Sequence, residues 1–137
     1  MRIAFGTDEQ SATTDAIVAI LRTDGHVVVE VARGAAWPEV GRTVGRAVAA
    51  GDAGFGVVCC TTGTGVSIAA NKVAGARAAL CTDATTAEGA RRWNDANVLA
   101  LSLRLTTEAL AAEIVRTFVS TPFDPDEAPA VDRVEPR

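Results

Sequence analysis

Residues 56–73 read GVVCCTTGTGVSIAANKV, and this stretch decides the fold. Its first part, residues 56–60, is apolar and too short for the core of a helix, so it predicts a buried strand. The small residues 61–65 predict a tight loop, and residues 66–73 predict a short helix. A strand, a loop of small residues and a helix in this order are typical of a parallel α/β protein.

The same alternation continues on both sides of this stretch. Apolar runs bounded by Gly, Asp, Thr or Asn predict four more strands, at residues 3–5, 27–31, 76–81 and 98–101. Apolar residues at helical spacing predict helices around residues 16–21, 40–48, 84–92 and 110–118. Asp83 is the expected N-cap of the helix at 84–92, and Thr106 or Thr107 that of the last helix. The order predicts one α/β domain over residues 1–120, with a parallel sheet covered by helices on both faces.

Residues 121–137 have a different character. They hold four of the five prolines, several acids and no helical period. Two interpretations stay open: a disordered tail, or a Pro-rich acidic arm that packs on a partner subunit.

Composition argues against a nucleic-acid-binding, membrane or secreted protein. The net charge of −4 argues against nucleic-acid binding, because phosphates need a basic face. No apolar run reaches the length of a membrane span, and the strand-like residues 1–5 leave no room for a signal peptide. The three cysteines, Cys59, Cys60 and Cys81, are odd in number and two are adjacent, which favours reduced thiols over disulfides. We therefore expect a cytoplasmic protein with no membrane partner.

Parallel α/β proteins bind ligands at the carboxyl ends of their strands. This rule selects a few residues that follow the predicted strands: Asp8, Trp37, the segment 60–65, Asp83 and Arg104. Segment 60–65 is the most informative, because a small-residue loop at a helix N-terminus presents N–H groups to a phosphate or to an oxyanion. A thiol beside such a loop can act as a base or nucleophile. The alternative is that Gly63 and Gly65 only permit a tight turn and that Cys60 is a small core residue.

Other kinds of site are not expected. Alternation places Cys59 and Cys60 on opposite faces of their strand, so only Cys60, nearer the loop, can face the site. No P-loop or dinucleotide-binding pattern is present, which argues against nucleotides. His26 is the only histidine and lies before a strand, which excludes a histidine-based metal site or a Ser-His-Asp triad.

Two longer motifs, CTTGTGVSIAANK at residues 60–72 and NDANVL at residues 94–99, resemble the ribose-5-phosphate isomerase B and galactose-6-phosphate isomerase family. The resemblance covers nearly the whole chain. It implies a three-layer α/β/α Rossmann-like domain with a five-stranded parallel sheet, a homodimer or dimer of dimers with sites between subunits, and no metal or organic cofactor. It also implies aldose–ketose isomerisation of a sugar phosphate through a cis-enediolate.

Roles carry over to matching positions. By resemblance, Cys60 is the catalytic base and Asp8 bonds sugar oxygens. The loop that holds the enediolate comprises Thr62, Gly63, Gly65 and Ser67. Substrate and phosphate contacts are implied for Asn94, Arg104 and Arg133, some of them reaching in from the partner chain.

The sequence departs from the family pattern around this site. Glu9 and Trp93 stand where the family usually has histidines, Trp37 replaces a tyrosine, Pro129 an arginine and Thr61 a glycine. The position of Trp93 is that of the ring-opening histidine. We therefore expect a small or open-chain sugar or sugar phosphate as substrate rather than efficient turnover of ribose 5-phosphate. The alternative is an altered homologue that binds a sugar-like ligand without isomerase activity.

Overall fold

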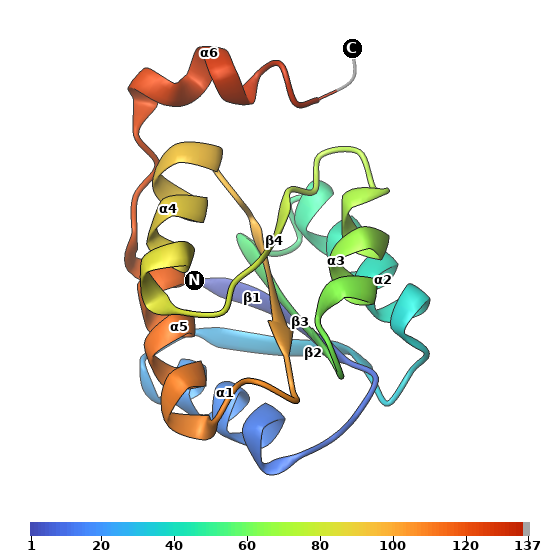
Figure 1. The fold of residues 1–137 in the computed structure, drawn as a ribbon. Coiled ribbons are helices and arrows are strands. Elements are labelled where there is room, and N and C mark those ends of the chain that lie inside the picture. The colour runs from blue at the N-terminus through green and yellow to red at the C-terminus, as the bar shows by residue number, and fades with distance from the viewer. Residues whose placement is uncertain (136–137) are drawn as a thin grey trace.

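The computed structural model describes residues 1–135 and contains one five-stranded sheet in which all neighbouring strands are parallel (Figure 1). The strand order is β2-β1-β3-β5-β4, so β1 and β3 are central and β4 is an edge strand. The strands are β1 (Arg2–Thr7), β2 (Val27–Arg33), β3 (Phe55–Cys60), β4 (Ala78–Leu80) and β5 (Val98–Ser102). The predicted parallel sheet is confirmed.

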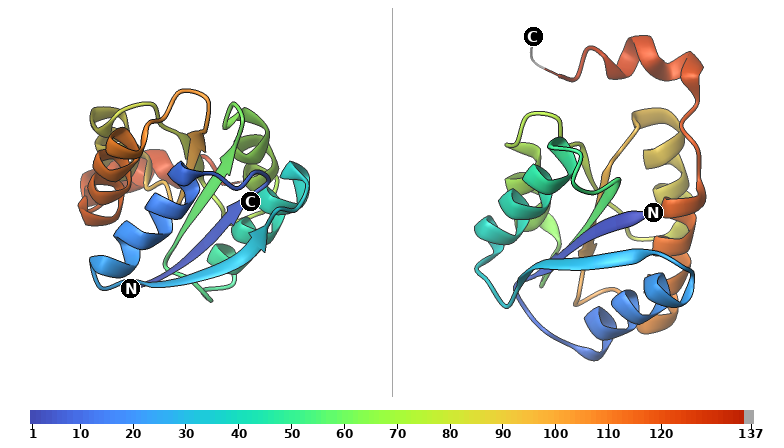
Figure 2. Two further views of the ribbon diagram at one scale, coloured as in Figure 1. Left: turned by 90° about the horizontal axis from the view of Figure 1, so that it is seen from below. Right: turned by 180° about the vertical axis from the view of Figure 1, so that it is seen from behind.

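Helices cover both faces of this sheet, which confirms the three-layer arrangement. One hydrophobic core packs α1 (Ala12–Thr23), α4 (Ala84–Asn94) and α5 (Glu108–Ser120) against one face. The other core packs α2 (Trp37–Ala49) and α3 (Thr64–Asn71) against the opposite face. Figure 2 shows both layers of helices from two further directions.

Alternation along β3 explains how one strand serves both cores. Val57 and Cys59 belong to the core under α1, α4 and α5. Val58 and Cys60 belong to the core under α2 and α3. Successive side chains of a strand point to opposite faces, so the central strand is apolar throughout and buried on both sides.

Polar side chains set where several helices begin. The Asp83 carboxylate accepts from the Thr86 N–H at 2.6 Å, and the Thr107 hydroxyl accepts from the Leu110 N–H at 3.1 Å, so both predicted caps are confirmed. Strand β4 spans only Ala78–Leu80, shorter than the predicted residues 76–81, and Asn71 bonds both backbone groups of Ala78 at its start. The Asn71 amide donates to the Ala78 carbonyl, and its oxygen accepts from the Ala78 N–H.

The chain after α5 forms a short 3-10 turn, η1 (Pro125–Glu127), and a helix of four residues, α6 (Ala128–Val131). This segment, residues 121–135, crosses the amino edge of the sheet (Figures 1 and 2). The Asp124 N–H donates to the Arg92 carbonyl at the end of α4, and Glu135 pairs with Arg77 just before β4. Residues 136–137 of the predicted arm lie outside the described residues. No helix within residues 1–135 is long and apolar enough to cross a membrane.

Candidate active site at the carboxyl edge of the sheet

Cys60 is the last residue of β3 and opens into a hollow of about 250 Å³ at the carboxyl edge of the sheet. The other lining residues are Asp8, Trp37, Thr61, Thr62, Thr64 and Gly65. Asp8 follows β1 and Trp37 begins α2, while Thr61 and Thr62 lie in the loop after β3 and Thr64 and Gly65 begin α3. The structure therefore brings Cys60, Asp8, Thr62, Gly65 and Trp37 together, as predicted from the carboxyl-edge rule.

Two glycines give the loop its shape. Gly63 has φ of +75°, and a Cβ there would lie 2.6 Å from Leu80 Cδ1 and 2.8 Å from the backbone carbon of Leu101. A Cβ on Gly65 would lie 2.8 Å from the ring of Trp37. Both positions thus demand glycine for steric reasons, so the tight turn is real. The same turn leaves the first N–H groups of α3 without helical partners at the positive end of its dipole, where an anionic oxygen is stabilised.

Asp8 contributes the most unusual polar group. Its Oδ1 atom is buried and has no hydrogen-bond partner among the described residues. Burial raises the pKa of the Asp8 carboxyl, and the neighbouring Glu9 charge raises it further. A buried oxygen without a partner costs free energy, and a hydroxyl group of a bound ligand would satisfy it.

The three thiols lie in different surroundings. Cys59 is fully buried in the core under α1 and α5, and burial raises the pKa of its thiol far above the ordinary range. Burial, and secondarily Asp83, raises the pKa of the Cys81 thiol to about 11. These two thiols are packing residues that stay protonated at neutral pH. Cys60 is the thiol that lines the hollow.

Three other predicted site residues lie near the rim of the hollow beside Cys60. Glu9 is exposed and directly follows Asp8. Ser67 lies one turn into α3, and its N–H donates to the Gly63 carbonyl at 3.2 Å. Arg104 is exposed, and its N–H donates to the Thr61 carbonyl at 3.1 Å, so its side chain starts beside the loop.

The remaining predicted residues lie away from Cys60 within one chain. Asn94 ends α4 near the amino edge of the sheet, and Trp93 is 56% exposed with its ring against Gly89. Arg133 follows α6 in the segment that crosses the same edge. Within the described chain, these three side chains are not brought to the hollow beside Cys60.

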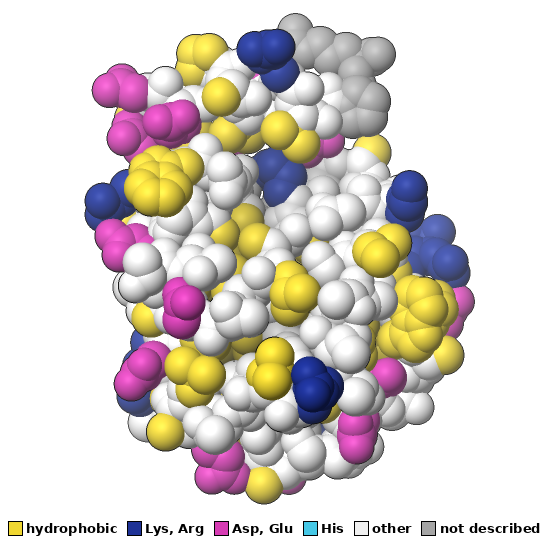
Figure 3. Space-filling model, in the orientation of Figure 1, with side chains coloured by type: hydrophobic (Ala, Val, Ile, Leu, Met, Phe, Trp, Pro, Cys, Tyr) yellow, Lys and Arg dark blue, Asp and Glu magenta, His cyan; other side chains and the backbone are white. Residues whose placement is uncertain are grey.

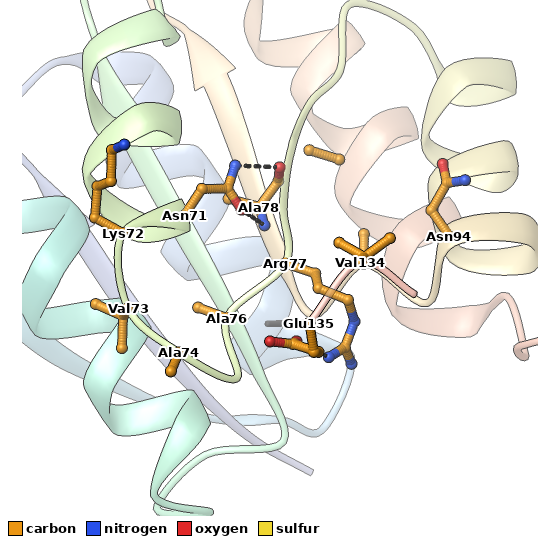
Figure 4. A pocket seen from close by; sticks show the side chains of 12 residues that line it. Asn71, Lys72, Val73, Ala74, Ala76, Arg77, Ala78, Asn94, Val134 and Glu135 are labelled. Carbon is orange, nitrogen blue, oxygen red and sulfur yellow. Dashed lines mark hydrogen bonds and ion pairs between the residues drawn. The ribbon is translucent and has the colours of Figure 1, made fainter. Parts of the chain in front are cut away.

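A larger cavity, of about 670 Å³, lies at that amino edge (Figure 4). Asn94, Val134 and Glu135 line it, and Glu135 forms an ion pair with Arg77 at 2.9 Å. We assign the chemistry to the smaller hollow despite its size, because it combines a thiol, an unpartnered carboxylate oxygen and the helix N-terminus. Of the three charged residues that line the larger cavity, Lys72, Arg77 and Glu135, the last two form an ion pair with each other.

Two structural roles escaped the sequence reasoning. Arg91 is 6% exposed, pairs with Asp95 at 2.9 Å and lies 4.5 Å from the Phe55 ring centroid, so it fixes the turn that carries the NDANVL motif. Asp95 itself has φ of +46°, which explains a short polar residue there. Ser102, buried at the end of β5, donates its hydroxyl to the Thr61 carbonyl. A serine in an apolar strand carries no signal that sequence patterns would detect.

Comparison with known proteins adds to this geometry. The profile of the family described as Ribose/Galactose Isomerase matches residues 3–135. The chain is 36% identical over 128 residues to ribose-5-phosphate isomerase B of Escherichia coli strain K12, covering 90% of this chain and 86% of that protein. It is 37% identical over 109 residues to galactose-6-phosphate isomerase subunit LacB of Clostridium acetobutylicum, covering 77% and 63%. It is 38% identical over 99 residues to D-erythrulose-4-phosphate isomerase of Pectobacterium atrosepticum, covering 72% and 65%. The matches thus span less than two thirds of the length of LacB and of D-erythrulose-4-phosphate isomerase.

Solved structures share the whole fold. Ribose-5-phosphate isomerase B of Clostridium thermocellum superposes with a TM-score of 0.90 at 35% identity, covering 98% of this chain and 95% of that one. The type B enzyme of Trypanosoma cruzi gives a TM-score of 0.91 at 34% identity with the same coverage.

Proposed function

We propose that this chain, which belongs to the ribose/galactose isomerase family, is an aldose–ketose isomerase that acts on a small, open-chain sugar phosphate better than on ribose 5-phosphate. The observation that carries the substrate class is the position of the only histidine. His26 precedes β2, and its ring lies 3.3 Å from the N-terminal amine of Met1, at the edge opposite Cys60. The indole of Trp93 can donate a proton but cannot accept one, so the chain offers no imidazole to open a furanose ring. A four-carbon ketose phosphate, the type of compound named for the Pectobacterium relative, needs no ring opening.

The reaction uses the residues of the hollow. Starting from the aldose, the Cys60 thiolate takes the proton from C2, the electron pair of the C2–H bond forms a C1=C2 double bond, and the C1 carbonyl becomes an oxyanion. The loop N–H groups from Thr62 to Gly65 stabilise this oxyanion. Asp8, whose carboxyl has a raised pKa, moves the proton of the C2 hydroxyl to the C1 oxygen. The Cys60 thiol then returns its proton to C1, which leaves the carbonyl on C2.

Binding of the phosphate needs cations that the hollow lacks. Lysine and arginine are absent from its lining residues within the described chain. Arg104 starts beside the loop and supplies one cation, whereas Arg133 of the same chain lies at the far edge. We assign the second cation, together with Asn94, to a second copy of the chain, whose residues 121–135 act as an arm across the subunit boundary. A homodimer or dimer of dimers then completes each site.

An apolar surface supports this assembly. Figure 3 shows hydrophobic side chains on the surface between α4 and α3, over the edge strand β4. The residues there include Leu80, Trp93 and Val134, and the last two are 56% and 67% exposed. Apolar side chains gathered over an exposed sheet edge are typical of a protein–protein interface. Light scattering at micromolar concentration should report at least two chains, and a fully active monomer would contradict the shared site.

The function is tested by measuring isomerisation of D-erythrulose 4-phosphate, ribose 5-phosphate and galactose 6-phosphate side by side. We expect the highest kcat/KM for the four-carbon compound and a value for ribose 5-phosphate well below the ~10⁴–10⁸ M⁻¹s⁻¹ of efficient enzymes. Cys60→Ala is the inactive control. Efficient turnover of ribose 5-phosphate would refute the substrate class. Thermal stabilisation by these compounds without turnover by the unmodified protein would favour a binding protein instead.

A further inference from the structure

We infer that Ser102 is a positioning residue for the reaction, and that its hydroxyl orients the Thr61–Thr62 peptide so that the Thr62 N–H faces the reacting oxygen. The inference rests on the proposed isomerase function and adds a residue to it. Ser102 is the last residue of β5 and is 2% exposed, so the substrate does not touch it.

Three hydrogen bonds join the start of the loop between β3 and α3 to the residues at the end of β5. The Ser102 hydroxyl donates to the Thr61 carbonyl at 3.0 Å, and the Arg104 N–H donates to the same carbonyl at 3.1 Å. The Leu103 N–H donates to the Cys60 carbonyl at 3.0 Å. The Thr61 carbonyl therefore points toward β5 and is held there by two donors.

Peptide geometry then fixes the direction of the next N–H. The C=O and N–H of a trans peptide point in opposite directions, because the peptide unit is planar. Strand β3 lies between β5 and β1, so the Thr62 N–H points toward the β1 side. Asp8 lies on that side and lines the hollow together with Cys60. Among the described residues, the Thr62 N–H has no hydrogen-bond partner in the protein, so it is available to a ligand.

The orientation of the Thr62 N–H should lower the free energy of the transition state more than that of the bound substrate. An N–H aimed at a developing oxyanion gains strength as the negative charge forms, provided it is fixed beforehand. Loss of the Ser102 hydroxyl leaves the Thr61 carbonyl with only the Arg104 N–H, so the peptide can tilt. The Thr61 carbonyl still keeps one donor, so the fold itself should lose little stability.

The test compares Ser102→Ala, Ser102→Thr and the unmodified protein on whichever sugar phosphate is turned over best. Thr106→Val is the matched control, because Thr106 is a buried hydroxyl residue of the same connection and does not hydrogen-bond to Thr61. We expect Ser102→Ala to lower kcat about three- to tenfold with less than a twofold change in KM, as for the loss of one oriented hydrogen bond. Ser102→Thr should recover at least half of the lost kcat, and Thr106→Val should leave kcat unchanged.

A binding measurement separates this inference from the proposed function. The probe is 3-phosphoglycerohydroxamate, whose planar N-hydroxyamide copies the cis-enediolate of a four-carbon substrate. Calorimetry should show about three- to tenfold weaker binding to Ser102→Ala than to the unmodified protein. Unchanged kcat and unchanged probe affinity in Ser102→Ala would overturn the role of Ser102 and leave the isomerase function standing. An unmodified protein that neither isomerises the sugar phosphates nor binds the probe would overturn both.

Discussion

The substitution Gly63→Ala tests whether the loop geometry limits both stability and chemistry. Two costs arise at this position. The backbone has φ of +75°, a conformation that costs a residue with a side chain roughly 1–2 kcal/mol. In addition, the new Cβ would lie 2.8 Å from the Leu101 carbonyl carbon and 2.9 Å from the Ser102 nitrogen. These are backbone atoms of β5 that cannot move alone, so overpacking adds about 1–3 kcal/mol.

A second glycine separates the two costs. Gly51 has φ of +79°, but a Cβ there would meet nothing within 4 Å. Gly51→Ala therefore carries the backbone cost without the contact cost. We expect the free energy of unfolding to fall by about 1–2 kcal/mol in Gly51→Ala and by about 2–5 kcal/mol in Gly63→Ala.

Urea unfolding at neutral pH measures both values, and isomerase assays on the same samples measure the chemistry. Gly51→Ala should keep its kcat, because Gly51 follows α2 at the other edge of the sheet. Gly63→Ala should lose more than tenfold, because the loop N–H groups move away from the reacting oxygen. Equal losses of stability in the two variants would refute the packing argument, and an unchanged kcat in Gly63→Ala would refute the role of the loop.

Three further predictions concern the thiols and the altered positions. Cys60→Ala should abolish turnover with folding intact, whereas Cys59→Ala should cost ~1 kcal/mol or less and keep turnover, which paired assays and urea titrations check. At alkaline pH, unfolded thiols lose protons from pH about 9, while folded Cys81 keeps its proton up to about 11. The unfolded state then binds fewer protons, so stability falls as pH rises, and Cys81→Ala should reduce that slope by about 1.4 kcal/mol per pH unit in urea titrations between pH 9 and 11. Trp93→His combined with Glu9→His should raise turnover of ribose 5-phosphate, and no gain would argue against the roles assigned to these positions.

The sheet could be predicted from sequence because both of its faces are buried. Each strand then reads as a short apolar run, and the interruptions by Gly, Asp and Thr mark the loops. Alternation also sufficed to assign Cys59 and Cys60 to opposite faces, as observed. The start of β4 could not be predicted, because the Asn71 side chain and the Asn97 contact to Arg77 set it from other parts of the chain.

The segment after α5 shows the same limit. Its residues have no helical period, and its course depends on contacts distant in sequence, such as that between Glu135 and Arg77. For the site, the carboxyl-edge rule selected the residues that line the hollow. It did not find Ser102, because the importance of that hydroxyl lies in the direction of a neighbouring carbonyl, which is a property of the folded backbone.

The positions that depart from the family pattern share a physical property. Glu9, Trp37 and Trp93 are exposed, and a change of side chain there alters charge or shape without disturbing either core. Two loop positions that keep the pattern are constrained by packing: Cys60 is 4% exposed, and Gly63 has three atoms within 3 Å of an added Cβ. Groups that would stabilise an enediolate are thus part of the packed end of the sheet, whereas groups that would recognise the rest of a substrate lie on its rim. A change of substrate with retained chemistry is therefore the route that costs this fold least stability, and it is the route that the proposed function follows.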